Sequence, residues 1–244
     1  MNTANPALGS NVFGQYRRSS YSSSFMTVGG AVNKTAILLF LVSVTAVWTW
    51  RIESEFRIAL FMGLGMVGTL LFGIITIFSH RSAPATAPMY ALSVGFFLGG
   101  LSALLEIQYP GVVFQAILLT FAVMFCLLLL YKSKVIRATE NFKLGIVSAI
   151  GAIFVIYIAS FILSFVGVGI PYIHESGYIG IAFSLFVVTI AALSLVLDFD
   201  FIERSADSGA PKHMEWYAAF ALIVTLVWLY VEILRLLIKI RSHD

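Results

Sequence analysis

Seven apolar segments separated by short polar breaks make up most of this 244-residue chain. Most of them are close to the roughly 20 residues that an α-helix needs to span the hydrocarbon core of a bilayer. The sequence therefore predicts an all-α fold, a bundle of seven transmembrane helices. The predicted spans are 36–50, which could start as early as Thr27, then 58–78, 89–107, 111–131, 144–166, 178–197 and 214–240.

The composition supports a membrane protein built as one transmembrane domain. Hydrophobic residues make up 60% of the chain and charged residues 11%, whereas a soluble domain has roughly 25% charged residues. The connections between spans are short, so residues 26–244 are predicted to form a single domain. Residues 1–25 are rich in Ser, Asn and Gly and lack the apolar core of a signal peptide, which predicts a disordered tail.

The Lys and Arg residues predict the orientation in the membrane. Ten fall on the N-terminal side of the predicted bundle and five on the opposite side, which by the positive-inside rule predicts a cytoplasmic N-terminus and an external C-terminus. The net charge of +3 therefore reflects loop anchors, and we expect no nucleic-acid partner. The ten are Arg17, Arg18, Lys34, Arg81, Lys132, Lys134, Arg137, Lys143, Arg204 and Lys212, and the five are Arg51, Arg57, Arg235, Lys239 and Arg241.

Carboxylates at or inside the predicted spans are the candidate functional residues. Each costs a few kcal/mol in a bilayer unless it is paired or hydrated. Asp198 and Asp200 end the sixth span and point about 200° apart on a helix, so we expect Asp198 to face the bundle and Asp200 the cytoplasmic interface. Glu232 lies inside the seventh span, where Arg235 at i+3 could neutralise it. Glu106 near the end of the third span could reach the interface or serve a pore.

Enzymatic and metal motifs are weak or absent in the sequence. His174 and Glu175 begin an HExxH-like pattern, but position 178 is Tyr and not the second histidine. We therefore expect no metal site and no cofactor. Gly95 and Gly99 have the GxxxG spacing that lets two helices approach closely in lipid, which predicts helix packing and not chemistry.

Two stretches near the C-terminus resemble the Bax inhibitor-1 family of membrane proteins. LSLVLDFDFI is similar to the family's sixth span, which ends in an aspartate, and LYVEILRLL is similar to its seventh span. NPALGSNVF and MTVGGAVNKTA near the N-terminus resemble a bacterial branch, which implies the bacterial inner membrane.

The resemblance implies a cation leak, typically for calcium, that is closed by two hydrogen-bonded carboxylates sharing a proton and that opens as the pH rises. Asp198 takes the sixth-span position and Glu232 the seventh. Because Asp200 stands where a non-acidic polar residue is expected, either aspartate could be the partner of Glu232. Two carboxylates in contact at low dielectric cannot both ionise, which gives a physical basis for such a pair.

Helix geometry sets a condition on this carboxylate pair. If the last helix begins at Met214, Glu232 lies 18 residues inside it, which is about 27 Å at 1.5 Å per residue. A sixth helix that ended at Leu197 would leave Asp198 out of reach. Contact therefore requires both helices to extend into the cytoplasm, with Asp198 well inside.

Two other functions remain compatible with the sequence. An intramembrane aspartyl protease also places one acid on each of two adjacent spans, but the Gly-x-Gly-Asp that such proteases carry is missing from both stretches, so we do not expect an enzyme. A non-conducting membrane protein with a regulatory or scaffolding role in stress responses is the alternative to a channel. The expected partners are the lipid bilayer and, for a leak, calcium or another cation.

Overall fold

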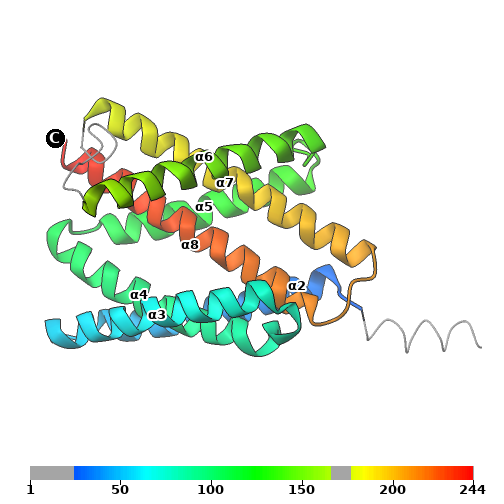
Figure 1. Ribbon diagram of the computed structural model, residues 1–244, viewed down its shortest axis with the longest axis horizontal. Helices are drawn as coiled ribbons and strands as arrows, with labels where there is room; N and C mark the ends of the chain where they lie inside the picture. Colours follow the sequence, from blue (N-terminus) through cyan, green and yellow to red (C-terminus); the bar gives the residue numbers. More distant parts are fainter. Residues whose placement is uncertain (1–24, 166–176, 244) are drawn as a thin grey trace, which may run out of the picture.

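The computed structural model describes residues 25–165 and 177–243 (Figure 1). Seven helices in these ranges are long and apolar enough to cross a membrane, and no strand occurs among the described residues. The predicted fold class is therefore confirmed. The tail up to residue 24 and the segment that contains His174 and Glu175 lie outside the described residues. The helices are α2 (Val28–Trp50), α3 (Glu55–Phe78), α4 (Ala83–Gln108), α5 (Val112–Lys132), α6 (Glu140–Phe165), α7 (Tyr178–Asp207) and α8 (Met214–Arg241), with a 3-10 turn, η2 (His80–Ser82), before α4.

The first span begins at the earlier of its two predicted positions, near Thr27, whereas the predicted end of the sixth span was wrong in a way that matters for the site. Helix α2 begins at Val28, where the Thr27 side chain caps it by accepting a hydrogen bond from the Gly30 amide at 3.0 Å. Helix α7 continues to Asp207, ten residues beyond the predicted end at Leu197. Hydropathy predicts where a helix leaves the lipid. The helix itself can continue further when its side chains pack against other helices. Beyond Leu197, Phe199 and Ile202 are still buried against other helices.

Helix α8 is the centre of the bundle. It packs against α2, α4, α5 and α7, and its side chains Ile223, Leu229 and Leu234 are fully buried in the main core. In Figure 1, α8 crosses the middle of the molecule and ends far from the start of α2. The start of α2 instead adjoins the α7–α8 loop, because the Met26 amide donates to the Ala210 carbonyl at 2.7 Å.

Helix α4 lies in close contact with α2 through its glycines. A Cβ at Gly95 would lie 2.5 Å from the Val42 carbonyl oxygen, and one at Gly99 would lie 2.8 Å from Cα of Ala46. Both distances are too short for any side chain larger than hydrogen. The close helix packing predicted from the GxxxG spacing is therefore confirmed.

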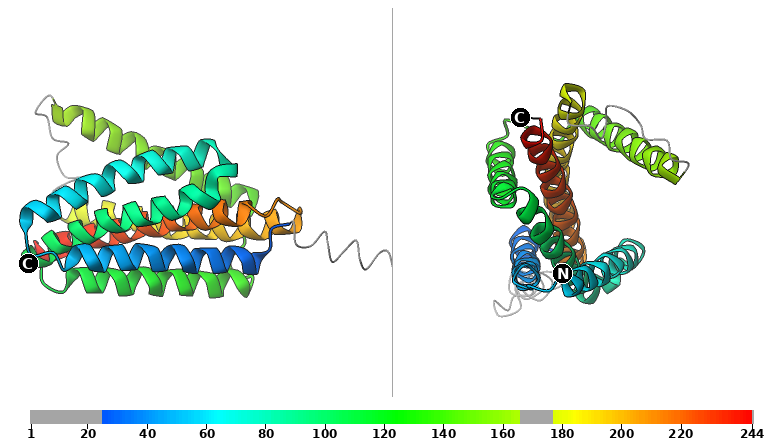
Figure 2. Two further views of the ribbon diagram at one scale, coloured as in Figure 1. Left: turned by 90° about the horizontal axis from the view of Figure 1, so that it is seen from below. Right: turned by 90° about the vertical axis from the view of Figure 1, so that its left-hand side faces the viewer.

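Helix α6 is the most loosely attached of the seven. Figure 2 shows it leaning away from the other helices, and among the described elements it packs mainly on α7. A small separate core joins the two helices, formed by Ile146 and Ile153 of α6 with Val187 and Ile190 of α7. The polar contacts of α6 described below therefore carry much of its attachment.

Candidate functional site

A line of polar side chains runs along one face of α8. Successive members are three or four residues apart, so they lie above one another on the same side of the helix. The neighbours of this line are α7 and α6, because its members lie beside Asp198 and bond Tyr157 and Gly180. We call it the polar stripe; its members are Thr225, Trp228, Glu232, Arg235 and Lys239.

Glu232 is the most heavily bonded member of the polar stripe. Its side chain is 2% exposed, and its carboxylate accepts hydrogen bonds from the Tyr157 hydroxyl at 3.0 and 3.2 Å and from the Trp228 indole at 3.3 Å. Arg235 donates to both carboxylate oxygens at 3.2 and 3.3 Å. The intrahelical ion pair anticipated from the i+3 spacing is therefore present, with a tyrosine of α6 added to it.

Arg235 lies on the solvent-accessible side of this cluster. Its guanidinium also donates to the Tyr157 hydroxyl at 2.7 Å and lies 5.2 Å from the centre of the Tyr157 ring. The side chain is 40% exposed, whereas Glu232 is buried. Arg235 thus neutralises Glu232 and also binds α6 to α8.

Asp198 faces α8, as expected. It lies at a different position along the bundle axis from Glu232. The Thr225 side chain lies beside its carboxyl group and donates its hydroxyl proton to the Ala221 carbonyl at 3.3 Å, while the Oδ2 atom of Asp198 is buried without a hydrogen-bond partner. A buried carboxylate oxygen without a partner makes the charged form costly. Asp198 therefore leaves one unsatisfied acceptor buried in the bundle.

Asp198 and Glu232 are not in contact. Thr225, which lies beside Asp198, precedes Glu232 by seven residues on α8, or about 10 Å along the axis. The extension of α7 to Asp207 places Asp198 nine residues before the end of α7. Glu232 lies 18 residues after the start of α8. Asp198 therefore does not reach the position of Glu232 along the helix pair. The two carboxylates occupy separate levels of the same helix interface.

Asp200 belongs to an ion-pair network at the end of the bundle. It accepts from Lys143 at 2.8 Å and from Arg204 at 2.9 Å, and Glu140 bridges the same two cations at 3.4 and 3.5 Å. The network joins the start of α6 to the last turns of α7. Asp200 is thus fully neutralised and does not reach Glu232.

Glu106 lies at the junction of α4 and α5. Its Oε1 atom accepts from the Gly111 amide at 2.7 Å, and Gly111 is the N-cap of α5. A carboxylate at a helix N-terminus is stabilised by the exposed amides and the helix dipole. Oε2 is buried without a hydrogen-bond partner. Glu106 thus makes a capping contact with α5. It does not contact Asp198, Asp200 or Glu232.

Glu215 is a buried acid that the sequence analysis did not single out. It is fully buried and accepts from the Thr27 amide and hydroxyl, both at 3.0 Å, and from Lys212 at 2.8 Å. It joins the start of α8 to the start of α2. The sequence gives little signal for this, because an acid in the first turn of a helix is usually an exposed partner of the helix dipole.

Tyr157 and Lys239 were also missed. Tyr157 is a single tyrosine in an apolar span, and Lys239 near a chain end resembles a loop anchor. Lys239 is in fact 6% exposed, and its ammonium donates to the Gly180 carbonyl at 3.1 Å. Within residues 25–165 and 177–243, no group of three His, Cys, Asp or Glu side chains is arranged to hold a metal ion.

Comparison with known proteins identifies the family. Searches of curated proteins and of solved structures found no match to this chain. The sequence profile described as Bax inhibitor 1 like matches residues 5–242, nearly the whole chain. Together with the seven membrane-spanning helices and the acids on α7 and α8, this match shows that the chain belongs to the Bax inhibitor 1 like family of membrane proteins.

Proposed function

We propose that this protein is a pH-sensitive cation leak whose pathway follows the polar stripe of α8 between α6 and α7. The observation that carries the proposal is the series of ionisable side chains in an otherwise apolar bundle. Asp200, Asp198 and Glu232 lie at successive levels from one end of the bundle inwards. Ionisable residues within membrane spans commonly mark ion or proton pathways.

In this proposal Asp198 responds to pH. Its Oδ2 atom is buried without a partner, and its polar neighbours are the neutral Thr225 on α8 and, two residues along α7, the already neutralised Asp200. Ionisation therefore leaves an uncompensated negative charge inside the bundle. Water or a cation must enter to stabilise that charge, which favours a hydrated, open pathway at higher pH. Oxygen ligands of this kind suit calcium.

Glu232, Arg235 and Tyr157 form the proposed closed gate. Arg235 and Tyr157 occupy both oxygens of the Glu232 carboxylate, so a passing cation has to displace a guanidinium. Because α6 has few other polar contacts with α8, loss of this cluster would free α6 to move. The two carboxylates thus act at separate levels instead of sharing one proton.

Calcium flux into proteoliposomes, measured between about pH 6 and 8, tests the proposal. Asp198→Asn removes the ionisable group and should flatten the pH profile. Asp200→Asn is the matched control two residues away, since two cations already neutralise Asp200, and it should keep the pH profile. Arg235→Ala should raise flux across the whole range. An unchanged profile in Asp198→Asn and Glu232→Gln alike would refute the role of these acids.

The same assay separates the alternative function. A non-conducting regulatory protein would give flux equal to that of empty liposomes at every pH and in every variant. An intramembrane aspartyl protease gains no support, since its two acids must act together on one water and here they are about 10 Å apart along α8.

We further propose that the protein lies in a bacterial inner membrane with its N-terminus in the cytoplasm. The start of α2 and the end of α8 lie at opposite ends of the bundle, as an odd number of spans requires, and the positive-inside rule then favours the end richer in Lys and Arg as cytoplasmic. Reporter fusions at Ser10 and His243 should give opposite sides. Two ends on one side would contradict the topology.

A further inference from the structure

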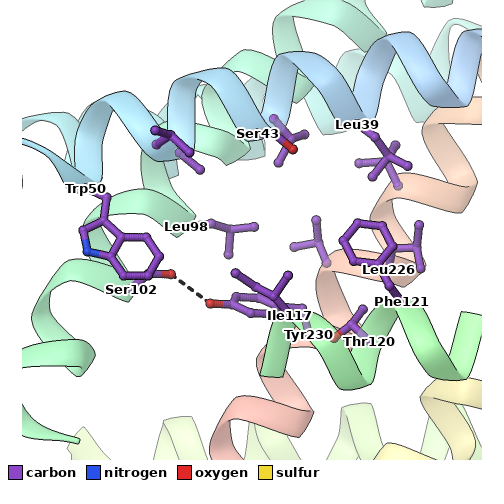
Figure 3. Close-up of a pocket in the computed structure, with 15 residues that line it drawn as sticks. Leu39, Ser43, Trp50, Leu98, Ser102, Ile117, Thr120, Phe121, Leu226 and Tyr230 are labelled. Atoms are coloured by element: carbon purple, nitrogen blue, oxygen red, sulfur yellow. Dashed lines mark hydrogen bonds between the residues drawn. The ribbon is translucent and has the colours of Figure 1, made fainter. Parts of the chain in front are cut away.

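A cavity of about 190 Å³ lies between α2, α4, α5 and α8, on the side of α8 away from the polar stripe (Figure 3). From α8 it is lined by Ile223, Leu226, Val227 and Tyr230, whereas the polar stripe begins with Thr225 and Trp228. Most of the lining is aliphatic or aromatic, and none of the lining side chains is acidic or basic. A cation in this cavity would have no countercharge, so it is distinct from the proposed ion pathway.

The cavity opens sideways towards the membrane. Helices α2 and α5 both pack on α8 but barely contact each other, and side chains of both helices on the rim are exposed, Val47 by 51% and Phe121 by 36%. In a bilayer this rim faces the hydrocarbon. The molecules with direct access to the cavity are therefore membrane lipids.

The two ends of the cavity differ in polarity. Leu39, Phe121 and Leu226 surround one end, while Trp50 and the hydrogen-bonded pair Ser102 and Tyr230 surround the other (Figure 3). Trp50 is the last residue of α2, so the polar end lies near the membrane interface, where tryptophan is favoured.

Hydrogen-bond donors remain available at the polar end. The Ser102 and Tyr230 hydroxyls lie 2.8 Å apart and share one hydrogen bond. Only one of their two protons is needed for that bond, so the other can be donated to a third group. The Trp50 indole supplies a further N–H on this wall (Figure 3). An acceptor such as an ester carbonyl fits these donors.

We propose that this cavity binds one acyl chain of a membrane phospholipid, with the chain end towards Leu39 and Leu226 and the ester carbonyl near Trp50 and Tyr230. The wall of α2 from Leu39 to Trp50 spans eleven residues, about 16 Å, which suits much of an extended chain. An apolar cavity of roughly 150 Å³ stays dry and takes up apolar molecules. This cavity is larger, and its rim is in contact with such chains.

Photo-crosslinking tests the proposal. The full-length protein is reconstituted with increasing mole fractions of a phospholipid that carries a diazirine near the end of one acyl chain, and the labelled residues are mapped by mass spectrometry. Crosslinks to Leu39 and Leu226 should saturate at a low mole fraction. Crosslinks to Phe40, which is 67% exposed on the outer face of α2, should rise in proportion to the probe.

Two neighbouring substitutions on α2 give a matched comparison. Ser43→Phe places a ring in the cavity (Figure 3) and should lower labelling of Leu226 about tenfold, the effect of roughly 1.4 kcal/mol of lost affinity. Val44→Phe adds the same ring where the side chain is 48% exposed and should leave labelling unchanged.

Either of two results would overturn the proposal: labelling of Leu39 and Leu226 that rises linearly like that of Phe40, or equal labelling in Ser43→Phe and Val44→Phe. If Ser43→Phe does not fold, the wild-type protein decides the question by itself. Excess unlabelled phospholipid must then compete away the saturable crosslinks while leaving those at Phe40 in proportion to the remaining probe.

Discussion

The substitution Gly30→Ala tests most directly how the contact between Thr27 at the start of α2 and Glu215 of α8 stabilises the protein. A Cβ at Gly30 would overlap with the Oε1 and Cδ atoms of Glu215. The carboxylate would have to move away from the Thr27 amide, the Thr27 hydroxyl and the Lys212 ammonium, all of which bond Oε1. Because Glu215 is fully buried, it has no water to replace these donors.

The expected loss follows from these three bonds. Hydrogen bonds to a charged group contribute about 1.5–3 kcal/mol each. The Lys212 side chain is 49% exposed and can follow the displaced carboxylate, so the loss is that of the two Thr27 bonds, about 3–6 kcal/mol. Replacing glycine by alanine in a helix returns up to about 1 kcal/mol. The net destabilisation of Gly30→Ala is therefore about 2–5 kcal/mol, or roughly 5–15 °C in Tm for a chain of this size.

Thermal unfolding of the purified protein in detergent provides the measurement. Tryptophan emission is the appropriate signal, because the free Cys126 is exposed and would react with a thiol probe before unfolding. Gly29→Ala is the matched control, since a Cβ at Gly29 meets nothing within 4 Å. It should be neutral or slightly stabilising.

A third variant isolates the steric cause. In a Glu215→Ala background, Gly30→Ala should cost no further stability, because the carboxylate that it displaces is gone. Two results would contradict the proposed contribution of the Thr27–Glu215 contact to stability. Gly30→Ala could be as stable as Gly29→Ala, or it could lower the free energy of unfolding as much without Glu215 as with it.

Three further outcomes are expected. Gly99→Ala should destabilise the protein by about 1–3 kcal/mol through overpacking against α2, whereas Gly63→Ala, with nothing within 4 Å of the added Cβ, should be neutral; equal Tm values would contradict the close helix contact. Arg235→Ala should cost about 3 kcal/mol, the low end for a broken buried ion pair, because Tyr157 and Trp228 still donate to the Glu232 carboxylate, and thermal unfolding should show a smaller loss when Glu232→Gln is also present. Asp200→Asn should cost about 1 kcal/mol, because the Arg204 and Glu140 side chains of its network are 58% and 76% exposed, and the difference in Tm from wild type should shrink at high salt.

The sequence predicted the parts of this structure that depend on local chemistry. The seven spans follow from apolar runs of bilayer length, and the contact of α4 with α2 follows from Gly95 and Gly99. The ion pair of Glu232 with Arg235 follows from their spacing on one helix. The different partners of Asp198 and Asp200 follow from the angle between residues two positions apart on a helix.

Other features depend on contacts between residues far apart in the chain. The end of α7 at Asp207, and hence the level of Asp198, is set by packing of Phe199 and Ile202 that hydropathy does not report. Tyr157 and Glu215 carry no recognisable signal in the sequence, because their partners are 75 and 188 residues away.

The sequence alone thus determined that the chain crosses a membrane seven times and carries acids on its last two helices, because transfer into lipid and helical periodicity act on each segment separately. The tertiary structure alone decided that Asp198 faces Thr225 while Glu232 is held by Tyr157 and Arg235 about 10 Å further along α8. The relative level of two antiparallel helices is fixed by side-chain packing along their whole length and by the loop that joins them. No short motif encodes that level.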